Sequence, residues 1–449
     1  MQVALYLFEA GALTAVLAIN RYYNLFGTLT IRQAIVLVVP LAVCLASASY
    51  VVLRFRRATT SESRSLSFAL ATNLVAVILL AAGSELVVRA LSVREPAGAS
   101  FAGTTLLPKS WEEVKARNAE ILSRVPPNIS YFVADDLLGW VPGPARRSAD
   151  GRYSSSAEGL RSSSPAVAYA SRSARHRVAI AGDSFTFGLE VPFEDSWGAV
   201  LETALGPDVA VLNFGVDGYG VDQAFLRYER DARPWKPAVV ILGFIDHDLY
   251  RTLSVYSFVT FPEWGFPFSK PRFVMKGGTL ERLTTRLESP TDILTKPLIS
   301  DLPFIAFDPG YDPDEWERHV YHASFGLRFL LSRLARWPPQ GAGTHLDELE
   351  RINIALISRF RELAEADGTR PLVVFFPSRG DFTGGDRPAR DAVFAALGRA
   401  GVEYIDLTSC VARVGVDTAF IPDRPHYSAE GNAAVAKCLL PAVRDALTP

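Results

Sequence analysis

Residues 178–188 read VAIAGDSFTFG, an apolar run followed by a Gly-Asp-Ser turn. The four apolar residues 178–181 predict a short buried strand, and Gly182-Asp183-Ser184 predicts the turn after it. Ser184 is therefore expected at the carboxyl end of a strand, the edge of a parallel sheet where ligands bind. A serine hydroxyl there is a candidate nucleophile, but it needs a base from elsewhere in the fold.

Four more apolar, β-branched runs alternate with helical segments further along the chain. This alternation predicts an α/β domain over residues 177–449, with a doubly wound parallel sheet of five strands. The expected strands are Val178–Ala181, Val209–Phe214, Ala238–Phe244, Pro371–Phe376 and Val402–Leu407. The expected helices are Trp197–Leu205, Asp222–Asp231, His345–Ala366, Arg387–Gly401 and Ala429–Leu447.

An insertion at about residues 250–344 interrupts this alternation. It begins with the aromatic and proline-rich segment Phe258–Pro271, which is expected to pack on the sheet or to line a sugar-binding groove. A hairpin over Arg272–Leu283, turning at Gly277-Gly278, and an amphipathic helix over Glu315–Trp337 are expected to follow. An insertion of this length at a strand's carboxyl end is more often functional than inert.

The candidate base lies in residues 421–431, IPDRPHYSAEG, directly before the last helix. Asp423 and His426 are three residues apart, so a compact turn can place the carboxylate on one imidazole nitrogen while the other faces Ser184. In that arrangement Asp423 orients the ring, His426 takes the proton and Ser184 attacks. The alternative is that His426 simply lies near a helix N-terminus with Ser428 as the N-cap.

Three ordered blocks of the sequence resemble the SGNH (GDSL-type) hydrolase superfamily: Gly182-Asp183-Ser184, Asn213–Gly218 and Asp423-x-x-His426. The resemblance covers about residues 131–447. Two lead-in segments, 135–140 and 158–161, resemble membrane-anchored bacterial members linked to surface polysaccharides. The resemblance implies a flavodoxin-like α/β fold and a serine esterase without metal or cofactor.

The resemblance also implies a role for each site residue. Ser184 is the nucleophile, His426 the general base and Asp423 the orienting carboxylate, while the backbone N–H groups of Ser184 and Gly218 form the oxyanion hole. The family supplies a third donor from an Asn side chain, but His247 stands at that position here. A neutral imidazole N–H can replace this donor; otherwise His247 is structural and the site is weakened or inactive.

Other polar clusters are weaker candidates. Asp246, His247 and Asp248 resemble metal ligands, but alternate positions of an extended segment diverge, so no metal is expected. His319 and His322 share a predicted helix face without an evident third ligand.

The first 96 residues are strongly apolar, with eight Arg and four Glu as their only charged side chains. Three runs, Val3–Ile19, Ile35–Leu53 and Phe68–Leu91, approach or reach the ~20 residues that span a bilayer. The expectation is three spans; two spans with an interfacial first segment are the alternative, and a signal peptide is disfavoured because no basic region precedes the first run. Glu85 and Arg89 are expected to form an i,i+4 pair or to reach the interface.

The distribution of arginines predicts the orientation. Four arginines lie between the second and third runs (Arg54, Arg56, Arg57 and Arg64), against Arg21 and Arg32 in the first loop. Because basic loops stay cytoplasmic, residues after about 92 are expected to face away from the cytoplasm. The preference for Arg over Lys suggests a bacterial genome, so the predicted place is the cytoplasmic membrane with a periplasmic domain.

The segment from 97 to 176 is expected to be a linker that packs partly on the domain, since Ser, Ala, Gly and Pro are frequent and no period persists. An extracytoplasmic domain permits a disulfide between Cys410 and Cys438. The formal net charge of −2 argues against a nucleic-acid-binding surface, and the 49% hydrophobic content excludes intrinsic disorder.

Three functions remain open from the sequence. The first is an outward-facing esterase acting on acyl or acetyl esters of a cell-surface glycan or lipid. The second is an O-acetyltransferase that passes the acyl group to a sugar hydroxyl, and the third is a catalytically silent glycan-binding protein. The expected partners are the acylated carbohydrate or lipid substrate, the lipid bilayer, and a membrane protein for polysaccharide export or acyl donation.

Overall fold

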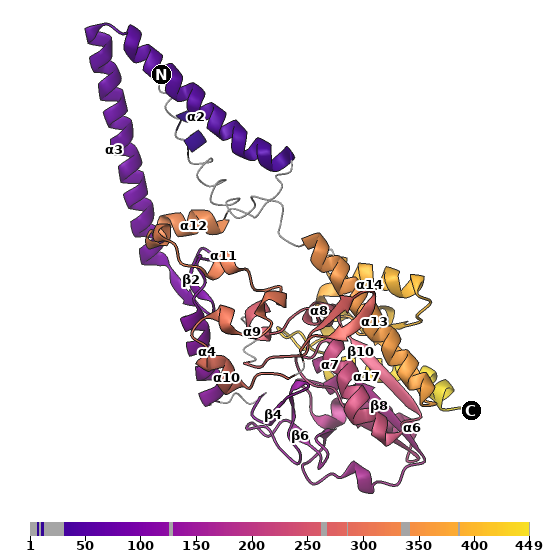
Figure 1. The fold of residues 1–449 in the computed structure, drawn as a ribbon. Helices are drawn as coiled ribbons and strands as arrows, with labels where there is room; N and C mark the ends of the chain where they lie inside the picture. Colours follow the sequence, from indigo (N-terminus) through magenta and orange to yellow (C-terminus); the bar gives the residue numbers. More distant parts are fainter. Residues whose placement is uncertain are drawn as a thin grey trace. The chain divides into compact units, whose positions relative to one another are not determined.

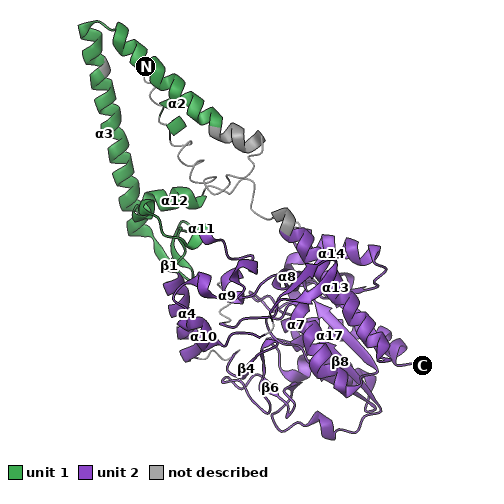
Figure 2. Cartoon of the chain, viewed as in Figure 1, with its two compact units in different colours: residues 1–110, 314–341 green, residues 111–313, 342–449 purple. Residues whose placement is uncertain are grey.

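The computed structural model describes residues 7–8, 10–12, 31–124, 129–261, 267–284, 286–333, 342–384 and 387–448. The chain divides into two compact units (Figure 2). Unit 1 comprises Met1–Ser110 and Asp314–Gly341, and unit 2 comprises Trp111–Pro313 and Ala342–Pro449. The expected division placed a membrane region at residues 1–96, a linker at 97–176 and the α/β domain at 177–449. In the structure residues 111–176 group with the α/β domain, and the segment 314–341 of the insertion groups with the N-terminal apolar helices.

Unit 2 is built on a five-stranded, all-parallel sheet in the order β14-β13-β10-β8-β9 (Figure 1). Numbered along the chain, this is the flavodoxin-like order 2-1-3-4-5 of a doubly wound fold, which confirms the fold predicted above. The strands are β8 (His176–Ala181), β9 (Val209–Asn213), β10 (Val239–Phe244), β13 (Arg370–Phe375) and β14 (Ile405–Asp406).

Helices cover both faces of this sheet, because its strands are apolar on both sides. One hydrophobic core joins a sheet face to α7 and α13, and a second core joins the other face to α6 and α17. The helices are α6 (Trp197–Leu205), α7 (Val221–Arg227), α13 (Ala342–Ala366), α14 (Pro388–Arg399) and α17 (Ala429–Leu447). The predicted helix over 222–231 continues past α7 as a π-helical turn, Tyr228–Ala232.

The insertion contains the expected hairpin but not the expected long helix. Strands β11 (Phe273–Lys276) and β12 (Thr279–Arg282) flank Gly277-Gly278, which both have positive φ. The expected helix over 315–337 is broken into α11 (Pro313–Trp316), a 3₁₀ turn (Val320–Ala323) and α12 (Phe325–Arg333), and residues 334–337 lie outside the described residues. His322 accepts from the His319 N–H, and Ser324 accepts from the Leu327 N–H. These side chains therefore satisfy backbone donors locally and interrupt the helix.

Residues 111–176 are more than a linker. They form helix α4 (Trp111–Arg124) and the strand pairs β4 (Phe132–Asp135) with β5 (Gly139–Pro142), and β6 (Ser154–Ser155) with β7 (Arg161–Ser162). Trp140 is fully buried, and its indole N–H donates to the Asp217 carbonyl beside the predicted oxyanion loop. The abundant small residues reflect tight turns in a packed segment rather than a free connection.

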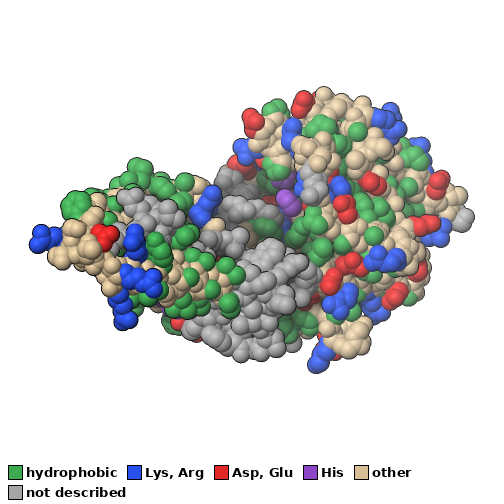
Figure 3. All heavy atoms as spheres, turned by 90° about the horizontal axis from the view of Figure 1, so that it is seen from above, with side chains coloured by type: hydrophobic (Ala, Val, Ile, Leu, Met, Phe, Trp, Pro, Cys, Tyr) green, Lys and Arg blue, Asp and Glu red, His purple; other side chains and the backbone are tan. Residues whose placement is uncertain are grey.

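Unit 1 contains α2 (Ile31–Arg57) and α3 (Thr60–Leu91), each long and apolar enough to cross a membrane. Many apolar side chains on these helices are exposed, including Leu45, Phe68 and Leu80, and Figure 3 shows apolar surface on this part of the chain. The first predicted run, Val3–Ile19, lies largely outside the described residues. Two candidate spans are thus described, and the third stays a prediction.

A polar contact holds α12 against the end of α3 within unit 1. Glu85 and Arg89 form the expected i,i+4 pair at 2.7 Å. Glu85 also accepts from the Ser324 hydroxyl and the Gly326 N–H, and Arg89 donates to the Ala323 carbonyl. The two charged side chains therefore anchor part of the insertion to an apolar helix.

The second core of unit 2 also contains the disulfide that the sequence left open. Cys410, on α15 (Thr408–Val414), is bonded to Cys438 on α17. The bond joins two helices on the same face of the sheet.

Candidate active site

The candidate nucleophile follows β8, the first strand of the sheet along the chain, which lies between β10 and β9. Ser184 begins the short helix α5 (Ser184–Phe187) after β8, and its neighbour Asp183 caps that helix by accepting from the N–H groups of Phe185 and Thr186. A Cβ at Gly182 would lie 2.1 Å from the Thr186 hydroxyl and 2.6 Å from the Gly243 carbonyl. Only glycine fits there, so the tight turn explains this position of the motif.

The structure brings Ser184 and His426 together as predicted. The His426 Nε2 lies 2.9 Å from the Ser184 hydroxyl oxygen. His426 precedes α17 in a turn that the Tyr427 hydroxyl fixes by donating to the Pro377 carbonyl. The Phe185 ring lies 5.2 Å from the imidazole, centroid to centroid, and packs against it. The arrangement is suited to general-base activation of a serine.

The carboxylate on the other imidazole nitrogen is Glu190, which sequence reasoning missed. Its Oε2 lies 2.9 Å from the His426 Nδ1. Glu190 stands in the turn after α5, six residues beyond Ser184, at φ 71°. A positive φ is costly for a glutamate, and such strain is concentrated at functional sites. Its backbone N–H donates to the Tyr153 hydroxyl, which helps to hold the turn.

The predicted orienting residue, Asp423, has a different place. It lies exposed in the turn before His426, at φ 57°. The Arg424 N–H closes this turn by donating to the Ile421 carbonyl. The D-x-x-H spacing therefore identified the imidazole correctly. The carboxylate that is hydrogen-bonded to this imidazole, however, is Glu190 and not Asp423. The turn leaves the Asp423 side chain at the surface instead.

The electrostatics favour an ionised Glu190. Burial alone raises the pKa of its carboxyl group, but the hydrogen bond from His426 and the charges of His426, Arg424 and Arg152 outweigh burial, and the net pKa is lowered. The carboxylate thus stays charged at neutral pH and favours the tautomer that carries the proton on Nδ1. This tautomer leaves Nε2 free to accept the Ser184 proton.

The loop after β9 carries the predicted oxyanion donor. Gly218 has φ 81°, and Asn213 braces the loop by accepting from the Gly215 N–H and donating to the Thr186 carbonyl. The conformation at Gly218 favours glycine. Ser184 and Gly218 thus follow adjacent strands, β8 and β9, at the same edge of the sheet.

His247 stands in the first turn of helix α8 (Asp246–Arg251), after β10, which neighbours β8 on its other side. The side chain is exposed to solvent, yet desolvation and the positive charges of Arg251 and Arg387 lower its pKa. The ring is therefore neutral at pH 7. A neutral imidazole keeps one N–H, which is what the predicted role requires.

The carboxylates around His247 have other partners. Asp248 accepts from the Ile245 N–H and from Arg251, and Asp246 lies 3.6 Å from Arg387. Within the described ranges, no group of three or more His, Cys, Asp or Glu side chains could hold a metal ion. His319 and His322 lie together with Tyr321 in a small ring cluster instead.

A buried arginine, also missed from the sequence, connects the three loops of the site. One nitrogen of Arg251, Nη1, donates to Asp248 at 2.6 Å and to the Tyr219 carbonyl at 3.1 Å, and it lies 3.8 Å from Asp183. Burial raises the pKa of both aspartates, and Arg251 opposes this effect. This single guanidinium thereby fixes the segments that carry Ser184, Gly218 and His247.

No family model matches the sequence, and no curated protein is significantly similar to it. Solved structures similar to the chain include a member of the lipolytic protein G-D-S-L family from Veillonella parvula (12% identity, TM-score 0.30, covering 60% of this chain and 98% of that one). Another is a carbohydrate acetylesterase family member from Sinorhizobium meliloti (15% identity, TM-score 0.29, covering 61% of this chain and 100% of that one). The esterase EstA from Pseudoalteromonas is a third (8% identity, TM-score 0.31, covering 61% of this chain and 100% of that one). By its motif residues and its sheet topology, the chain resembles the SGNH (GDSL-type) hydrolases.

Proposed function

We propose that the protein is a serine esterase of the SGNH type, anchored in a membrane and acting outside the cytoplasm on acyl or acetyl esters of a cell-surface carbohydrate. The observation that carries this proposal is the continuous hydrogen-bonded series from Glu190 through His426 to Ser184. The helices α2 and α3 and the basic segment between them support the anchoring and its direction.

The reaction follows from this geometry. The Ser184 oxygen attacks the ester carbonyl as its proton passes to the His426 Nε2, and Glu190 stabilises the imidazolium that forms. The N–H groups of Ser184 and Gly218, with His247, bind the oxyanion of the tetrahedral intermediate. The imidazolium then returns the proton to the leaving alcohol oxygen. Water, deprotonated by His426, hydrolyses the acyl-enzyme and releases the acid.

The test is to incubate the purified full chain, in detergent, with p-nitrophenyl acetate and with acetylated xylan, and to measure free acetate. We expect the wild type to release acetate and Ser184→Ala to release none above background. If acetyl groups moved to a glycan acceptor with little free acetate, the protein would be an acetyltransferase. A folded wild type without either reaction would favour the glycan-binding alternative.

His247→Ala is expected to lower kcat about 10²- to 10³-fold, because this is the usual loss when one oxyanion donor is removed. Since the lowered pKa keeps the His247 ring neutral, the ring offers a single N–H donor across neutral pH. His247→Asn supplies an amide donor at the same position and is expected to retain more activity than His247→Ala. Steady-state kinetics with p-nitrophenyl acetate distinguish the two variants. Equal, unchanged kcat values in both would remove His247 from the site.

A further inference from the structure

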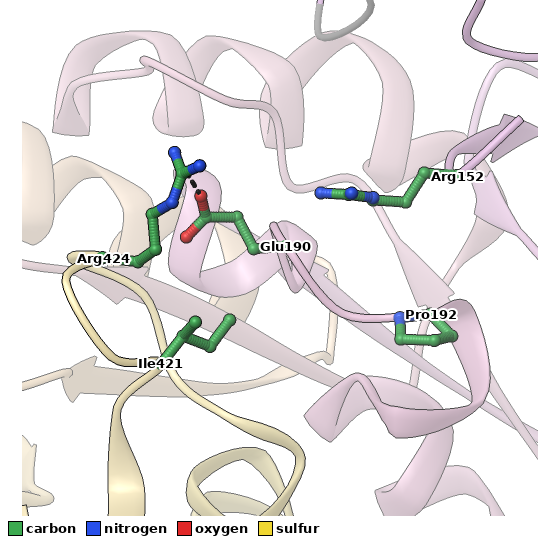
Figure 4. A pocket seen from close by; sticks show the side chains of 5 residues that line it. All are labelled: Arg152, Glu190, Pro192, Ile421 and Arg424. Atoms are coloured by element: carbon green, nitrogen blue, oxygen red, sulfur yellow. Dashed lines mark ion pairs between the residues drawn. The ribbon is translucent and has the colours of Figure 1, made fainter. Parts of the chain in front are cut away.

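Glu190 lines a cavity of about 400 Å³. In the hydrogen-bonded series Ser184–His426–Glu190, the cavity therefore lies at the Glu190 end. Its lining combines two arginines, one carboxylate and two apolar side chains: Arg152, Glu190, Pro192, Ile421 and Arg424. Figure 4 shows Arg424 pointing at Glu190 and Arg152 approaching from the opposite side. The reaction described above uses neither arginine as a donor to substrate.

Both guanidinium groups keep N–H donors for a ligand. The Arg424 Nη1 lies 3.6 Å from the Glu190 Oε1, and the Arg152 Nε lies 3.9 Å from Asp150. Both distances exceed a hydrogen bond, so neither ion pair saturates its guanidinium. Arg152 also hydrogen-bonds to the Tyr153 side chain, which uses one of the five N–H groups of a guanidinium and leaves others for a ligand. The two side chains are also about half exposed or more, at 53% for Arg152 and 65% for Arg424.

The charge balance of the cavity favours an anion. Glu190 contributes the negative charge in the lining, and its Oε2 is already bonded to His426. Two arginines and one carboxylate therefore line the cavity, and the second carboxylate nearby, Asp150, lies outside the lining, 3.9 Å from Arg152. Arginine forks bind carboxylate and phosphate oxygens by paired, charge-assisted hydrogen bonds.

Two side chains, Glu190 and His426, connect the cavity to Ser184. Glu190 lines the cavity with one carboxylate oxygen and holds His426 with the other, and His426 contacts Ser184. One carboxylate and one imidazole thus separate the two arginines from the nucleophile. Pro192 and Ile421 supply the apolar contacts that a sugar ring or an acyl chain accepts.

We propose that Arg152 and Arg424 form a subsite for an anionic substituent, a carboxylate or a phosphate, on the molecule that carries the ester. This inference rests on the proposed function, since it names the substrate class of the same site. An acidic glycan, such as one with uronic acid units, combines both requirements: a sugar hydroxyl for the ester and a carboxylate for the arginines.

Titration calorimetry of the full chain in detergent tests the subsite without requiring catalysis, because the variant Ser184→Ala serves as the host. The probes are a galacturonic acid trimer, a neutral galactose trimer and inorganic phosphate. We expect the galacturonic acid trimer or phosphate to bind, the neutral trimer to bind at least about tenfold more weakly, and affinity to fall as NaCl rises from 50 to 500 mM. Binding of the uronate alone identifies a carboxylate subsite, and binding of phosphate alone identifies a phosphate subsite.

Arg152→Gln is the decisive variant, because the side-chain partners of Arg152 in the described part of the chain are Asp150 and Tyr153, and it is expected to weaken anion binding about tenfold or more. The matched control is Arg399→Gln, which removes an arginine of similar exposure, 64%, paired with Glu350 elsewhere on unit 2. The control is expected to bind like the host. Equal binding of acidic and neutral trimers, no binding of either anion, or unchanged binding in Arg152→Gln would overturn the subsite. If the wild type had no esterase activity, this result would overturn the proposed function and not the subsite, because the binding measurements use the inactive Ser184→Ala host.

Discussion

Glu190→Gln is expected to lower kcat/KM for ester hydrolysis about 10³- to 10⁴-fold, whereas Asp423→Asn is expected to change it less than about threefold. The Glu190 carboxylate accepts from the His426 Nδ1 at 2.9 Å. An amide there presents its N–H₂ group as readily as its oxygen, so the imidazole loses the tautomer that leaves Nε2 free. Asp423 lies exposed in the preceding turn and carries no such contact in the described structure.

Hydrolysis of p-nitrophenyl acetate by the full chain measures both variants, and circular dichroism confirms that they are folded. Because the pKa of Glu190 is lowered in the folded protein, the Glu190–His426 interaction stabilises the fold above the ordinary pKa of glutamate. That stabilisation is lost as the pH falls through the lowered value, so the assays belong at neutral pH. The opposite ranking, with Asp423→Asn the more damaged variant, would restore Asp423 as the orienting residue.

Lys270→Met is expected to destabilise unit 2 by about 3–5 kcal/mol, because it leaves a buried carboxylate without its partner. Lys270 and Asp222 are both fully buried, and the Nζ–Oδ2 distance is 2.5 Å. Lys270 also donates to the carbonyls of Ser254 and Pro271. Burial lowers the pKa of Lys270 and raises that of Asp222, and each partner opposes the effect on the other. The pair joins the insertion to α7, just after the loop that carries Gly218.

Chemical denaturation of the full chain, followed by tryptophan fluorescence, gives the change in the free energy of unfolding. The double variant Lys270→Met/Asp222→Leu is the control, and it is expected to recover most of the loss because no unpaired charge remains. If Lys270→Met were as stable as the wild type, the buried ion pair would not hold the insertion in place.

Local patterns predicted the framework of the site well. The run 178–181 before Gly182-Asp183-Ser184 identified both the first strand of the sheet and the position of the candidate nucleophile, because a buried parallel strand is continuously apolar. The helix over 429–447 and the turn before it likewise placed His426 at the correct edge of the sheet. These features depend on residues close together in the sequence.

The residues that sequence reasoning missed act across the fold. Glu190 reaches His426 from a strained turn 236 positions earlier in the chain, and no periodicity marks a positive φ at a glutamate. Arg251 and Lys270 pair with carboxylates or carbonyls on other segments, so their roles appear only when the sheet has assembled. The D-x-x-H spacing favoured Asp423 because it was the carboxylate nearest in sequence, and tertiary structure selected another.

Labelling with a fluorophosphonate probe tests most directly whether Ser184 is an activated nucleophile. The full chain is purified in detergent and treated with the probe beside Ser184→Ala and Glu190→Gln, with circular dichroism to confirm folding. We predict covalent labelling of the wild type at Ser184, none in Ser184→Ala and slow labelling in Glu190→Gln. A folded wild type that remains unlabelled, or labelling that persists in Ser184→Ala, would contradict the proposed role of Ser184 as the nucleophile.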